Sequence, residues 1–169
     1  DTDNDQDRSW TYYAVNPYYA YEIDTSGQKI ELDFNAARFK IDNMNTLSTI
    51  SSLDTNTISR QRYIQTGDTK IYATKIDYTK PLNKIFELKV GAKYSMADLD
   101  NDLQSNFLQD SVWVDNVNQS NHYLFEEKIY ATYAKLGWTS GDWSGTAGLR
   151  YENSQSIGTS LTVDTTLRR

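Results

Sequence analysis

Long segments of this chain place an apolar or aromatic side chain at every second position, with charged, small or polar residues between them. In the segment 85–96, Phe86 begins a series of apolar side chains on one face of an extended chain, and Glu87 begins the polar series on the other. The segment from Trp143 to Glu152 repeats the pattern. This period of two predicts β-strands with two unlike faces, so the apolar face must meet either a protein core or lipid.

The alternating segments predict about six long strands, over residues 10–24, 28–41, 69–79, 85–96, 122–138 and from 143 onward. Short turns near Gly27, Pro81 and Gly141 alternate with long polar loops, which we expect at 42–68 and 98–121. Short and long connections in strict alternation are typical of an up-and-down barrel that crosses a membrane. The fold class predicted is therefore all-β, an antiparallel up-and-down meander of about six long strands within a larger transmembrane β-barrel.

Composition favours a boundary between water and apolar material. Tyrosine occurs 13 times against 5 phenylalanines, and an aromatic ring with a polar tip suits a membrane interface. The mean hydropathy of −0.71 fits a barrel, in which only alternate strand residues touch lipid. No run approaches the roughly 18 apolar residues of a membrane helix. The net charge of −6 argues against nucleic acid as a partner, because phosphates would be repelled.

Five segments carry a resemblance to a known family: Tyr18–Asn35, Ile76–Leu82 (IDYTKPL), Leu88–Ser95 (LKVGAKYS), Phe125–Leu136 (FEEKIYATYAKL) and Trp143–Glu152 (WSGTAGLRYE). In their order and spacing they resemble the barrel portion of TonB-dependent outer-membrane receptors, and the branch common in Bacteroidetes above all. The resemblance implies that residues 1–169 form part of a barrel of about 22 strands, without the plug domain or the TonB-engaging segment.

The resemblance also implies a function. Such receptors lie in the outer membrane of Gram-negative bacteria and import a scarce nutrient of the glycan, siderophore or cobalamin class. The partners expected are outer-membrane lipid, the nutrient, and the plug and TonB complex through the rest of the receptor. We expect neither a cofactor nor an enzyme activity, since His122 has no neighbouring metal ligand in the sequence and the aspartates of the DTDNDQD start lack an EF-hand pattern, which favours a disordered acidic stretch there.

Two groups of residues are candidates for a role in function. The first group comprises charges expected to face the barrel lumen, either as routine ion pairs on a hydrated strand face or as contacts of a plug: Lys75, Asp77, Glu87, Lys89, Lys93, Arg150 and Glu152. The second group lies in the two expected loops, where side chains either bind ligand or pack the loop onto its neighbours: Arg60, Arg62, Tyr63, Phe107 and Trp113.

An alternative hypothesis is a soluble all-β binding domain, such as a lipocalin-like barrel, whose apolar face would line a closed core or a small-ligand cavity. That alternative requires the last strand to close on the first, whereas the polar tail from Ser154 to Arg169 resembles the start of another loop. An isolated barrel segment would instead expose strand edges and apolar stripes, which favours non-physiological self-association.

Overall fold

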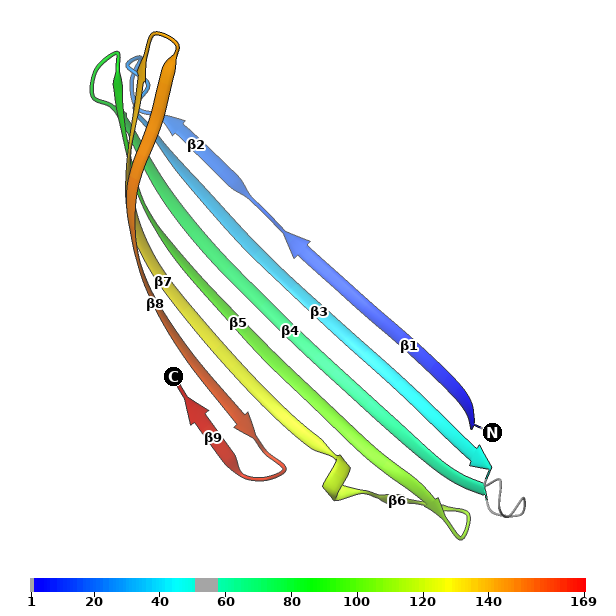
Figure 1. Ribbon diagram of the computed structural model, residues 1–169. Helices are drawn as coiled ribbons and strands as arrows, with labels where there is room; N and C mark the ends of the chain where they lie inside the picture. Colours follow the sequence, from blue (N-terminus) through cyan, green and yellow to red (C-terminus); the bar gives the residue numbers. More distant parts are fainter. Residues whose placement is uncertain (1, 51–57) are drawn as a thin grey trace.

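The computed structural model describes residues 2–50 and 58–169, which form one long, twisted antiparallel sheet (Figure 1). Its strands follow the sheet order β1-β3-β4-β5-β7-β8-β9, with β2 also paired to β3 and β6 to β5. Their bounds are β1 Thr2–Val15, β2 Tyr18–Glu22, β3 Lys29–Ile50, β4 Ile58–Pro81, β5 Phe86–Gln109, β6 Val112–Asp115, β7 Asn121–Ser140, β8 Trp143–Ser160 and β9 Thr165–Arg168. The one helical element described is the 3₁₀ turn η1, Val117–Gln119.

The prediction of about six long antiparallel strands is confirmed. The first of them is the pair β1 and β2, which lie end to end along β3 and are separated at Asn16 and Pro17. Proline has no N–H to donate, so it interrupts a ladder most easily at a sheet edge such as this one. The other five are β3, β4, β5, β7 and β8, and β6 and β9 are short strands that fold back on β5 and β8.

The prediction of long polar loops is wrong over most of their length. β3 continues to Ile50 and β4 begins at Ile58, so residues 42–50 and 58–68 are paired strand; residues 51–57 lie outside the described residues. β5 likewise continues to Gln109 through the second expected loop, which holds only the turn after Gln109, β6 and η1. The acidic start is also ordered, because Thr2–Val15 pairs with β3, and the tail forms the rest of β8 and β9. Backbone pairing persists in these segments although many of their side chains are polar.

The short turns lie where the sequence predicts them, at the end of the sheet called here the turn end. Gly27 has a φ of +92°, and Asp24 accepts hydrogen bonds from the backbone N–H groups of Ser26 (2.9 Å) and Gln28 (3.3 Å). Hydrogen bonds from Ser26, led by its hydroxyl, lower the pKa of Asp24. The other two turns contain Asn83, whose side chain accepts from Ile85 and Phe86, and Gly141. The opposite end, near Ile50 and Gln109, is the loop end.

The described strands do not close into a barrel. β1 and β9 lie at opposite edges of the sheet, and no pairing joins them among the described residues. The closed lipocalin-like alternative is therefore not formed by this part of the chain. Within the same residues, no helix reaches the length and apolar character required to cross a membrane.

The pairing registers run without a bulge, so each side chain can be assigned to a face of the sheet. Directly paired residues share a face, and alternate residues of a strand lie on opposite faces. One face carries Asp77, paired with Glu31 and Gly91, and is called the Asp77 face. The other carries Val90, paired with Tyr78 and Ala134, and is called the Val90 face.

Candidate functional site

The Val90 face carries an apolar band near the turn end. Three consecutive rows of paired residues on β3, β4, β5, β7 and β8, from the row of Val90 to the row of Tyr94, contain no charged side chain. Large apolar side chains in this band are exposed, among them Ile76 at 45%, Tyr130 at 46% and Leu149 at 84%. A contiguous exposed apolar surface of this kind requires an apolar partner.

The band ends at a row of aromatic residues. Tyr94 and Tyr130 pair directly and their ring centroids lie 5.0 Å apart, with Phe34 in the same row on β3. Two rows further toward the loop end, Arg38 begins a charged belt on the same face: Arg38, Lys70, Asp98 and Glu126, followed by Lys40, Asp68 and Asp100. An aromatic row between an apolar band and charges is the arrangement found where a membrane surface meets water.

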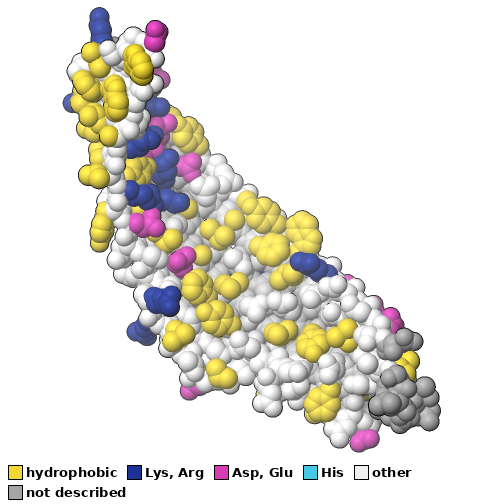
Figure 2. All heavy atoms as spheres, in the orientation of Figure 1, with side chains coloured by type: hydrophobic (Ala, Val, Ile, Leu, Met, Phe, Trp, Pro, Cys, Tyr) yellow, Lys and Arg dark blue, Asp and Glu magenta, His cyan; other side chains and the backbone are white. Residues whose placement is uncertain are grey.

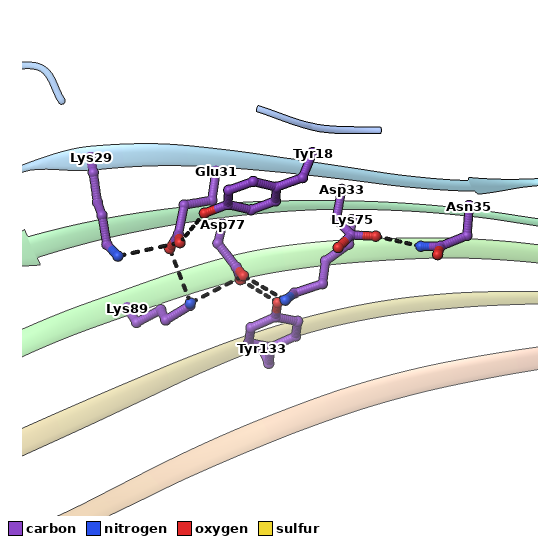
Figure 3. Close-up of polar contacts among 9 residues, drawn as sticks. All are labelled: Tyr18, Lys29, Glu31, Asp33, Asn35, Lys75, Asp77, Lys89 and Tyr133. Atoms are coloured by element: carbon purple, nitrogen blue, oxygen red, sulfur yellow. Dashed lines mark hydrogen bonds and ion pairs between the residues drawn. The ribbon is translucent and has the colours of Figure 1, made fainter. Parts of the chain in front are cut away.

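On the Asp77 face, the rows behind the apolar band hold a network of charged and phenolic side chains (Figure 3). The Asp77 carboxylate is 2% exposed and lies 2.8 Å from Lys75 Nζ and 3.1 Å from Lys89 Nζ. Lys89 Nζ also lies 3.4 Å from Glu31, which accepts a hydrogen bond of 2.6 Å from the Tyr18 hydroxyl. This Asp77 network links β2, β3, β4 and β5 and leaves the buried carboxylate fully paired, as a buried charge requires.

A glycine makes room for the last link of the Asp77 network. The Tyr133 hydroxyl of β7 donates a hydrogen bond to Asp77 of β4 across the intervening strand β5. At the crossing point β5 carries Gly91, where a Cβ would lie 2.5 Å from both the Asp77 Oδ1 and the Tyr133 Oη atoms. A side chain at this position would separate the two groups, so the link depends on glycine.

A basic hollow lies beside the network on the same face. Its volume is about 420 Å³, and its lining includes Lys75, Lys93, Lys135 and Arg150 around the ring of Tyr133. Lys75 is paired with Asp77, and Arg150 hydrogen-bonds Glu152 on its own strand. Lys93 and Lys135 form no ion pair with any residue that the structure describes, so the hollow retains positive charge.

The two faces exchange character halfway along the strands. The apolar residues of β3 lie on the Val90 face as far as Ala36 and mostly on the Asp77 face from Ala37 onward, and β5 changes likewise between Met96 and Ala97. The exceptions are Met44, Ile50 and Leu108, which lie on the Val90 face. In the half toward the loop end, the Asp77 face of β3, β4, β5, β7 and β8 carries a single charged residue, Glu127. Figure 2 shows this division on one face of the molecule: charges gather near the turn end, and hydrophobic and uncharged side chains cover most of the rest, with a few charges midway and at the edges.

The seven charges predicted to face a lumen all lie on the Asp77 face, but only some of them meet. Lys75, Asp77 and Lys89 form the centre of the network, and Lys93 and Arg150 line the basic hollow. Glu152 pairs with Arg150, and Glu87 makes no ion pair within the described residues. Glu31, Tyr18 and Tyr133 were not among the candidates predicted from the sequence, although the alternation of Glu31 with Ile30 and Leu32 places it on the charged face of its strand.

The five candidates in the expected loops are divided between the two faces of the strand extensions. Arg62 and Trp113 lie on the Val90 face, with the guanidinium carbon 4.5 Å from the indole centroid, and Arg60 lies on the same face of β4. Tyr63 and Phe107 lie on the Asp77 face. The structure therefore does not bring the five together into one site.

Comparison with known proteins agrees with this architecture. The RagAB peptide transporter shares the fold at low sequence identity (10% identity, TM-score 0.58, covering 93% of this chain and 20% of that chain). The unliganded ferric citrate transporter FecA also matches, at 13% identity and a TM-score of 0.47, covering 83% of this chain and 22% of that chain. The chain thus spans about a fifth of either structure. A search of the curated proteins gave no match. The model of the outer membrane protein beta-barrel family matches residues 21–169, so the chain belongs to this family of the outer membrane.

Proposed function

We propose that this chain is part of the wall of a TonB-dependent transporter that imports a scarce nutrient across the outer membrane. The observation that carries the proposal is the division of the sheet into an exposed apolar band on one face and a paired ionic network directly behind it on the other. In a membrane barrel the first faces lipid and the second faces a hydrated lumen. A lumen wide enough for a plug needs many more strands than those described here.

The length of the apolar band fits one crossing of the outer membrane. With its flanking rows, the band extends on β5 from Phe86 to Met96, and 11 residues at about 3.3 Å each, tilted by about 45°, span about 26 Å. The apolar band of outer-membrane barrels is about 25 Å tall. Lys80, paired with Leu88, and Lys128, paired with Met96, lie in these flanking rows, from which a lysine can extend its ammonium group to the interface. The turn end then lies at the periplasm and the loop end outside the cell.

The basic hollow supports a plug as a partner. It lies on the Asp77 face at the level of the apolar band, where the plug of a transporter fills the lumen. Lys93 and Lys135 offer ammonium groups without an ion pair there. Carboxylates on a plug would neutralise these charges and help to fix the orientation of the plug in the lumen. We infer that acidic side chains of the plug contact this hollow.

The test of transport uses the complete receptor in its own bacterium, with a strain that lacks the receptor as the control. Uptake of labelled maltoheptaose, ferric citrate, cyanocobalamin and a synthetic hexapeptide is measured with and without a protonophore. We expect one probe to accumulate in cells that have the receptor and not in the strain that lacks it. The protonophore should abolish this accumulation. Accumulation that persists with the protonophore would indicate a passive pore, and no receptor-dependent accumulation of any probe would contradict the transport proposal.

A further inference from the structure

The Asp77 face of the loop half, beyond Ala37 on β3, Ile71 on β4 and Ala97 on β5, is called the vestibule face. Apart from aliphatic and small residues and two charged ones, its side chains are of two kinds. The aromatic ones are Phe39, Tyr63, Phe107, Tyr123 and Phe125, with Trp10 and Tyr12 on the edge strand β1. The carboxamides are Asn43, Asn45, Gln61, Gln65, Asn101, Gln109 and Asn121, with Asn4 and Gln6 on β1.

The vestibule face is nearly free of charge, in contrast to the surface behind it. Its described residues hold one acid, Glu127, and one base, Arg8 on β1, whereas the Val90 face of the same strands carries the charged belt and the aspartates of β1. Both surfaces lie above the membrane band and meet water there. Solubility in water therefore does not explain why one of these surfaces is charged and the other is not.

The carboxamides form a surface that both donates and accepts hydrogen bonds. Gln65 Nε2 donates to Asn101 Oδ1 at 3.0 Å, Gln6 Nε2 donates to Asn43 Oδ1 at 2.9 Å, and the Tyr63 hydroxyl donates to Gln61 Oε1 at 2.9 Å. Each amide keeps further donor and acceptor sites after these bonds. Such a surface matches a ligand whose hydroxyl groups also do both, and offers no cluster of cations to an anionic iron chelate.

The aromatic side chains are spread along the strands and are not gathered at one point. They occur from the row of Phe39 and Phe125 to the row of Phe107, which corresponds to eight residues of β3, or about 26 Å. An extended series of flat apolar surfaces suits a chain of sugar rings, each with one apolar face, better than a compact ligand.

We propose, building on the transport function above, that the vestibule face binds a neutral oligosaccharide. Amide side chains hydrogen-bond its hydroxyl groups, and the aromatic rings stack against the apolar faces of successive sugars. A ferric chelate, cobalamin or a peptide with charged termini lacks the series of hydroxyl groups, the successive apolar ring faces or the neutral charge that this surface suits.

The test is the uptake assay of the complete receptor, extended to neutral oligosaccharides of three linkages: maltoheptaose, cellohexaose and xylohexaose. We expect receptor-dependent uptake of at least one of them, and none of ferric citrate, cyanocobalamin or the hexapeptide. Protonophore-sensitive uptake of ferric citrate, cyanocobalamin or the hexapeptide, without uptake of any of the three sugars, would overturn the ligand class and leave the transport function intact. The absence of receptor-dependent uptake of every probe would contradict both the ligand class and the transport function.

Variants on adjacent residues of opposite faces locate the binding surface. Phe39→Ala and Asn101→Asp alter the vestibule face, and Lys40→Ala and Asp100→Asn alter the Val90 face one residue away. We expect the first pair to weaken binding of the transported sugar about tenfold, as loss of a stacking ring or a mismatched hydrogen bond does, and the second pair to leave it unchanged. Equal effects of the two pairs at equal receptor abundance would overturn the assignment of the site to the vestibule face.

Discussion

Tyr133 and Asp77 lie on strands that do not pair with each other, yet the phenol of one donates a hydrogen bond to the carboxylate of the other across Gly91. The contact joins β4 to β7 above β5. Like the pair of Lys89 on β5 with Glu31 on β3, it adds a side-chain link between next-nearest strands to the backbone ladders that join neighbouring strands. Because Asp77 also pairs with Lys75 and Lys89, removal of one member affects several strands at once.

Replacing the glycine tests this link directly. In Gly91→Ala the new methyl group would overlap Asp77 and Tyr133, and we expect the complete receptor to lose about 1–3 kcal/mol of stability. Gly137→Ala is the matched control, since a Cβ there meets only the Glu87 carbonyl oxygen at 3.9 Å. Urea unfolding of the receptor in lipid vesicles measures both, and equal midpoints for the two variants would contradict the role of Gly91.

Loss of the Asp77 charge leaves two lysines facing each other. Asp77→Ala removes the carboxylate that pairs with Lys75 and Lys89, and we expect a loss of about 3–5 kcal/mol because the carboxylate is buried. Glu152→Gln breaks an exposed pair with Arg150 and should cost less than about 1 kcal/mol. Both values follow from the same unfolding measurement. A cost for Asp77→Ala no larger than that for Glu152→Gln would show that the network contributes nothing.

The charged belt gives the receptor a stability that depends on acid pH. Asp68 accepts two hydrogen bonds from the Arg38 guanidinium, of 2.9 and 2.5 Å, and these lower the pKa of Asp68. A lowered folded-state pKa means that the stabilisation is complete above the unfolded value of about 3.9 and is lost as the pH falls through the folded value. Asp68→Asn should therefore be less stable than the natural receptor at pH 6, with a difference that shrinks toward pH 3. Arg38→Gln should give the same dependence of stability on pH. A stability difference between Asp68→Asn and the natural receptor that does not change with pH would show that the Asp68–Arg38 pair is not the source of the pH dependence.

The position of the membrane can be measured with single cysteines introduced into residues 1–169, which contain none. Ile76 lies in the apolar band and Lys70, six residues earlier on the same face of β4, lies in the charged belt. In intact cells we expect a membrane-impermeant maleimide to label Lys70→Cys and to leave Ile76→Cys unmodified. Rapid labelling at both positions would place the band in water and contradict the assignment of lipid to the Val90 face.

The strands near the turn end could be predicted from the sequence because their two faces differ strongly. Alternation from Phe86 to Met96 places Glu87, Lys89 and Lys93 on one face, as the structure has them. The position of Gly91 beneath Tyr133 could not be predicted, since it depends on the register between β5 and β7 and not on either strand alone.

The strand extensions were not predicted because their alternation changes phase. Apolar residues occupy even positions of β3 as far as Ala36 and mainly odd positions from Ala37, apart from Met44 and Ile50, so a pattern of period two breaks at the two alanines although the strand continues. Beyond that point the Asn, Ser and Thr residues of 42–50 resemble a loop. Only the pairing of β3 with β4 shows that they form strand.

The change of faces halfway along the strands also selects the membrane in which the protein is stable. An apolar band of about 26 Å is shorter than the roughly 30 Å hydrocarbon core of an average bilayer, and the outer membrane is thinner than average. In a thicker bilayer Arg38, Lys70 and Asp98 would be drawn toward the hydrocarbon, since the apolar residues beyond them on that face, such as Met44 and Ile64, are scattered among polar ones. On the lipid-facing assignment proposed above, the spacing between the aromatic row and the turns would therefore favour a thin membrane over a thick one.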